Sequence, residues 1–113
     1  MKLQEVIDTL DLNVLTDPSL IQDQDPEFGY ASDMLSCVMS TAKHQGLWVT
    51  LQAHLNIIAV ATLLDLSAII ITEGAQPDQS VIDKANAENI PLLATPLDTF
   101  EIVGRLWQLG IRA

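Results

Sequence analysis

The sequence is poor in cysteine and in basic residues. A single cysteine, Cys37, rules out an internal disulfide, and five Lys and Arg against fifteen Asp and Glu give a formal net charge of −10. Such a charge repels nucleic-acid phosphates and anionic lipid surfaces, so we expect neither as a partner. The chain also starts without a basic-then-apolar leader, and we expect a reducing, cytoplasmic environment for it.

Motifs for catalysis and for metal binding are also missing. Phosphoryl transfer needs a glycine-rich loop followed by Gly-Lys-Ser or Gly-Lys-Thr, whereas the glycines here are isolated and neither tripeptide occurs. Cys37, His44 and His54 have unrelated spacings, which do not suggest a zinc site. The loop that carries Asp23 and Asp25 lacks the spacing and the glycine of a calcium loop. We therefore expect a protein that is not an enzyme and that has no cofactor.

Hydrophobic residues make up 49% of the 113 residues, enough for one domain with a buried core. Strand-like apolar runs alternate with segments of helical periodicity, which is typical of parallel strands joined by crossover helices. The sequence thus predicts a single α/β domain over residues 1–113, a layered fold with a mostly parallel sheet of four or five strands flanked by helices. Helices are expected over 3–10, 34–42, 56–66, 79–89 and 97–109, and strands over 13–16, 28–31, 47–51, 67–72 and 90–94.

Two local features refine this prediction. Residues 1–33 contain eight acids and one base and so contribute −7 of the net charge, and their acidic segment 17–27 reads as a mobile loop. The last helix is predicted to begin with Thr95 as its cap and Pro96 at its first position.

Polar residues follow the strands of the predicted sheet. Gln52, His54 and Asn56 come between a strand and a helix, and the carboxyl ends of parallel strands meet at the edge where ligands usually bind. Together with free helix-start amides they could hold an anion or a heterocycle. The alternative is that His54 or Asn56 only caps the helix while Gln52 bonds nearby backbone. The other strand-to-helix junctions add Ser32, Asp33, Thr72 and Thr95 to the candidate ligand-binding residues.

The helix predicted over 56–66 is apolar almost all round. A helix with one face in water should carry polar residues on that face, so this one is either fully covered within the domain or buried against a second copy. Because a chain of 113 residues has little material for a second covering layer, we expect a homodimer through helix 56–66.

Several of these segments resemble one known family. They are Gly-Tyr-Ala-Ser-Asp-Met-Leu-Ser at 29–36, Leu-Trp-Val-Thr-Leu-Gln-Ala-His-Leu-Asn at 47–56, Ala-Val-Ala at 59–61, Gly74, Ile-Pro-Leu-Leu at 90–93, and residues 95–100. With these segments, nearly the whole chain resembles the DRTGG domain family. The segment that corresponds to the family's name-giving motif, residues 25–29, departs from it at Glu27 and Phe28.

The resemblance implies a function as well as a fold. Domains of this family look like relatives of the N-terminal domain of bacterial HPr kinases, and they also occur in phosphate acetyltransferases and, beside nucleotide-sensing CBS modules, in inorganic pyrophosphatases. By resemblance the chain is a free-standing, dimeric regulatory domain that binds an adenine nucleotide or another small anionic metabolite. The alternative is a structural or assembly subunit of a metabolic enzyme, without a small-molecule ligand.

Overall fold

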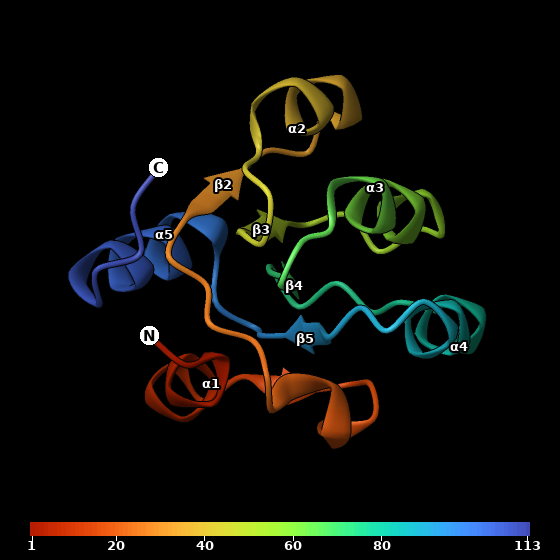
Figure 1. Ribbon diagram of the computed structural model, residues 1–113, viewed down its shortest axis with the longest axis horizontal. Helices are drawn as coiled ribbons and strands as arrows, with labels where there is room; N and C mark the ends of the chain where they lie inside the picture. The colour runs from red at the N-terminus through yellow and green to blue at the C-terminus, as the bar shows by residue number, and fades with distance from the viewer.

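Five short strands form one sheet at the centre of the molecule, in a computed structural model that describes all of residues 1–113 (Figure 1). The sheet order is β1-β5-β4-β3-β2; strands β2 to β5 are parallel, and β1 pairs antiparallel with β5. The prediction of an α/β fold with a mostly parallel sheet is confirmed. The strands are Asn13–Val14 (β1), Gly29–Ala31 (β2), Leu47–Thr50 (β3), Ala68–Ile71 (β4) and Leu92–Ala94 (β5).

Helices cover both faces of the sheet. Figure 1 shows α2, α3 and α4 on one face and α1 and α5 on the other. The core is divided in the same way, since alternate residues of a strand point to opposite faces: Leu47 and Val49 pack with α1 and α5, whereas Trp48 packs with α2 to α4. The helices are Leu3–Leu10 (α1), Leu35–Thr41 (α2), Asn56–Leu64 (α3), Gln79–Ala87 (α4) and Thr99–Gln108 (α5), with a 3-10 helix at Pro18–Ile21 (η1).

Strands β3 and β4 are buried along their full length. The central run of β4, residues 68–71, is therefore apolar without alternation, as expected for a parallel strand that has helices on both sides. None of the helices combines the length and the apolar character needed to cross a lipid bilayer.

Helix α3 lies between α2 and α4 on the three-helix face (Figure 1). Ile57, Ile58, Val60 and Ala61 are buried against the sheet and the neighbouring helices, whereas the side chain of Leu63 is 68% exposed. The central position of α3 explains most of its apolar character, because two flanking helices as well as the sheet contact it. Dimerisation through this helix stays a prediction.

The start of α5 differs from the prediction. Asp98 caps this helix, with its Oδ1 accepting the N–H of Glu101 at 2.8 Å, and the helix begins at Thr99. The prediction that Thr95 caps the helix and Pro96 opens it is wrong. The hydroxyl of Thr95 instead accepts the N–H of Leu97 at 3.2 Å, which makes a turn before the helix.

The acidic segment 17–27 is tied to the domain at several points. Asp17 caps η1, and its backbone N–H donates to Asn86 Oδ1 at 2.8 Å. The backbone oxygen of Gln24 accepts the N–H of Leu3 at 3.0 Å, and Asp25 lies 2.9 Å from the amino group of Met1. The segment thus contains regular structure and long-range contacts.

Candidate functional site

The loops that follow β2, β3, β4 and β5 open at one edge of the sheet, as parallel strands require. All seven residues predicted from the sequence lie there, and the structure divides them into two groups. The first group follows β2 and β3 and includes Ser32, Asp33, Gln52, His54 and Asn56. The second follows β4 and β5 and consists of Thr72 and Thr95.

Asp33 links the loops after β2 and β3. Its Oδ1 accepts hydrogen bonds from Thr50 Oγ1 at 2.8 Å and from the N–H of Leu51 at 2.9 Å. Thr50 Oγ1 in turn accepts the N–H of Gln52 at 3.2 Å. Sequence analysis missed Thr50, because a threonine that ends a buried strand looks like any other β-branched strand residue.

Ser32 also connects the end of β2 with β3. Its Oγ accepts the N–H of Met34 at 3.1 Å, and its carbonyl oxygen accepts the indole N–H of Trp48 at 2.9 Å. These bonds hold the loop after β2 in place. The hydroxyl and carbonyl oxygens of Ser32 are thus already hydrogen-bonded to other groups of the protein.

The second group holds the loops after β4 and β5 together. Thr72 is fully buried, with its hydroxyl 2.7 Å from that of Thr99. Glu73 accepts the N–H of Thr99 at 2.8 Å, and the N–H of Gly74 donates to the carbonyl of Thr95 at 3.1 Å. A protein carboxylate therefore already occupies the start of α5, where the helix dipole would favour an external anion. We conclude that Thr72 and Thr95 are structural parts of this edge.

At the start of α3, by contrast, the backbone N–H groups are free. No atom of the chain accepts a hydrogen bond from the backbone N–H of Ala53, His54, Leu55 or Asn56. The side chains of His54 and Asn56 are exposed, and neither caps the helix, so the capping alternative is wrong for both. Four consecutive N–H groups at a helix start are donors that favour an anion.

Gln52 directly precedes these donors in the sequence and carries an acceptor. Its Oε1 is buried and has no hydrogen-bond partner. A buried oxygen without a donor costs about 1–3 kcal/mol, and buried polar atoms in folded proteins are nearly always paired. The segment 52–56 therefore offers one unused acceptor and four unused donors, which suits a ligand that carries both an N–H group and an anionic oxygen. No group of three His, Cys, Asp or Glu side chains is placed to hold a metal ion.

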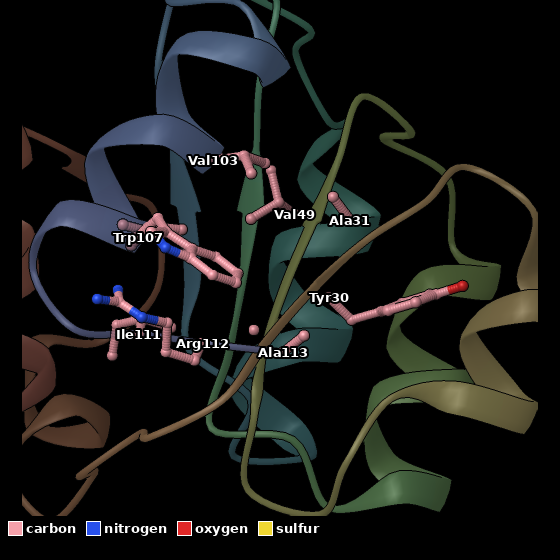
Figure 2. Close-up of a pocket in the computed structure, with 10 residues that line it drawn as sticks. Tyr30, Ala31, Val49, Val103, Trp107, Ile111, Arg112 and Ala113 are labelled. Carbon is pink, nitrogen blue, oxygen red and sulfur yellow. The ribbon is translucent and has the colours of Figure 1, made fainter.

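A pocket with a mostly hydrophobic lining lies elsewhere, beside β2 and α5 (Figure 2). It has a volume of about 180 Å³. Its signal in the sequence is weak: small residues at alternate positions of β2, and two large apolar residues one turn apart on α5. Sequence analysis missed it. The lining includes Gly29, Ala31, Val49, Val103, Trp107 and Arg112.

Known proteins resemble the chain in sequence and in fold. A family model described as "DRTGG domain" matches residues 5–109. A crystal structure of the CBS and DRTGG domains of the regulatory region of Clostridium perfringens pyrophosphatase, complexed with its activator diadenosine tetraphosphate, superimposes with a TM-score of 0.69 at 19% identity. The alignment covers 91% of this chain and 44% of that one, so the present chain spans less than half of that regulatory region. No curated protein matches the chain.

Proposed function

Because the chain belongs to the DRTGG domain family, we propose that it is a non-catalytic regulatory domain that senses a small anionic metabolite. The family match and the solved structure support this proposal: that structure comes from the regulatory region of an enzyme and holds a nucleotide activator. By analogy, the partner that the domain regulates is a metabolic enzyme.

The observation that carries the proposal is the unsatisfied segment 52–56. Its free N–H groups would bind a phosphate or carboxylate, and Gln52 Oε1 would accept an N–H of the same ligand. The exposed ring of His54 would stack on a heterocycle or donate a hydrogen bond. An adenine nucleotide has both the anionic oxygens and the exocyclic amino group that this arrangement requires.

Charge restricts the choice of ligand. The chain has a net charge of −10, and Asp33 bonds to Leu51, next to the segment. Because these charges repel anions, we expect a ligand with a single phosphate to bind better than a polyphosphate of the same base. The helix-start amides supply most of the attraction.

The experiment is a thermal-shift screen of AMP, ADP, ATP and common metabolites, followed by calorimetry. A ligand that binds only the folded state must raise the melting temperature. We expect His54→Ala and Gln52→Ala each to weaken binding by about five- to a hundredfold, which corresponds to about 1–3 kcal/mol. The matched controls are His44→Ala and Gln22→Ala, at exposed positions outside this edge; both should bind like the wild type.

The alternative is a structural or assembly subunit. Exposed Phe100 and Trp107 and the apolar cavity beside β2 favour this second function. If no compound shifts the melting temperature while Gln52→Ala still changes it, segment 52–56 has only a structural role and the sensing proposal falls.

A further inference from the structure

Asp33 uses only one of its two carboxylate oxygens inside the protein. Its Oδ1 accepts both the hydroxyl of Thr50 and the N–H of Leu51, whereas its Oδ2 has no hydrogen-bond partner in the chain. Thr50 is fully buried at the end of β3, and Asp33 itself is exposed. Two hydrogen bonds to a rigid strand end therefore hold the carboxylate in one orientation and leave Oδ2 as a free acceptor.

This free acceptor lies next to segment 52–56. The hydroxyl of Thr50 contacts both, because it donates to Asp33 Oδ1 at 2.8 Å and accepts the N–H of Gln52 at 3.2 Å. The buried Gln52 Oε1 and the free N–H groups of residues 53–56 follow directly along the chain. The Asp33 carboxylate and segment 52–56 are therefore parts of one region at the carboxyl edge of the sheet.

The charge of this carboxylate restricts the kind of group that can contact Oδ2. An anion placed against Asp33 would be repelled, and the net charge of −10 adds to the repulsion. A metal ion needs several ligands, and no group of three His, Cys, Asp or Glu side chains is placed to hold one. An ionised carboxylate only accepts hydrogen bonds, so the group that fits here is a neutral donor, such as a hydroxyl.

Exposed apolar side chains flank the same polar groups. Met34, which follows Asp33, is 61% exposed, and Leu51 and Leu55, in the loop after β3, are 44% and 48% exposed. Apolar side chains around a few polar groups are typical of sites that bind a ligand with a planar or apolar part. The region thus offers an apolar surface, an acceptor for neutral donors and amides for an anion. The base, the sugar hydroxyls and the phosphate of a nucleotide match these three features.

From this geometry we infer that Asp33 Oδ2 binds the ribose hydroxyls of a nucleoside monophosphate and makes the site selective for ribonucleotides over deoxyribonucleotides. The inference rests on the proposed function, because it adds one contact to the ligand that segment 52–56 would hold. The sugar of a nucleotide separates the phosphate from the base, so its hydroxyls meet the carboxylate while the phosphate stays at the helix-start amides. In dinucleotide-binding α/β folds an acidic side chain accepts a ribose hydroxyl in the same way.

The test compares AMP with its 2′-deoxy and 3′-deoxy analogues by calorimetry on the full chain. We expect the wild type to bind AMP at least about tenfold more tightly than one of the two analogues, because hydrogen bonds to a charged group are strong. In Asp33→Asn, the N–H of Leu51 can only donate and so keeps the amide oxygen in the place of Oδ1. The amide nitrogen then replaces the free oxygen, and the variant should lose most of the preference for AMP.

Asp23→Asn is the matched control, because it removes one charge at an exposed position outside this edge, and it should keep the preference. Equal binding of the three nucleotides by the wild type, a result that needs no variant, would overturn the inference and leave the proposed function intact. A preference that survives in folded Asp33→Asn would also overturn it, since another group then recognises the sugar. If none of the three nucleotides binds, the inference falls, and the metabolite screen decides separately whether the domain senses another small anion.

Discussion

At the scale of single residues, Asp33 shows how a side chain chosen as a ligand contact can serve the fold. Its carboxylate accepts the hydroxyl of buried Thr50 and the N–H of Leu51. We expect Asp33→Ala to lower the free energy of unfolding by about 1–3 kcal/mol, because both donors lose their acceptor. Asp33→Asn keeps an acceptor oxygen, so its free energy of unfolding should fall by less. Urea denaturation measures both, and equal losses in the two variants would contradict this role.

Asp17 allows a test of how the stability of the fold depends on pH. The backbone N–H of Ser19, and secondarily its side chain, bond the carboxylate and hold the pKa of Asp17 below its ordinary value of 3.8. Because the pKa is lower in the folded state, the ionised carboxylate stabilises the fold at pH values above its ordinary pKa. This stabilisation is lost as the pH falls through the lower pKa of the folded state. An NMR titration of the carboxyl should show this low pKa. Ser19→Ala should retain most of the effect, because the backbone donor remains, and Ser19→Pro should remove it.

At the scale of the element, α3 combines core packing with an exposed apolar residue. Val60 is part of the core, so a lysine there would unfold the domain, whereas Leu63 is 68% exposed and is the position to alter. If α3 forms the homodimer interface, Leu63→Lys should give a folded monomer. Light scattering at tens of micromolar, roughly the range in which an interface of standard size holds, measures this.

Ser80→Lys, at an exposed position of α4, is the control for that experiment and should remain dimeric. A wild type that is monomeric at the same concentration would exclude the α3 interface.

The helix starts show how the same local chemistry has different outcomes. Helix α5 is held by Asp98 and Glu73, whereas α3 begins with four unused N–H groups. The difference is one of tertiary structure, because Glu73 belongs to the loop after β4 and reaches α5 only through the neighbouring positions of β4 and β5. The N–H groups of Gln79 and Ser80 at the start of α4 also have no acceptor in the chain, so the buried Gln52 Oε1, rather than the free donors alone, distinguishes the start of α3.

At the scale of the whole molecule, the prediction concerns chemistry with ATP. No glycine-rich phosphate loop is present, and the start of α5 is occupied by carboxylates. Incubation of the purified protein with magnesium and ATP should therefore release no phosphate and should label no acceptor. Product formation that is lost on mutation of an acidic residue would contradict this prediction.

The two faces of the sheet are covered unequally by helices. Helices α2, α3 and α4 cover one face of the sheet and α1 and α5 the other, and Gly29 and Ala31 of β2 line the apolar cavity on the α5 side (Figures 1 and 2). The order β1-β5-β4-β3-β2 places β2 at the edge of the sheet, where α5 contacts it on one face and α2 on the other.

The sequence determined the alternation of strands and helices, the α/β class, and the edge at which the polar residues gather, because periodicity and burial are encoded locally along the chain. Only the tertiary structure decided that Thr72 and Thr95 join loops, that Asp33 bonds Thr50, and that Asp98 rather than Thr95 caps α5. It also decided where the cavity lies. Those outcomes depend on which loops become neighbours when the strands are ordered in the sheet, and no local pattern specifies that order.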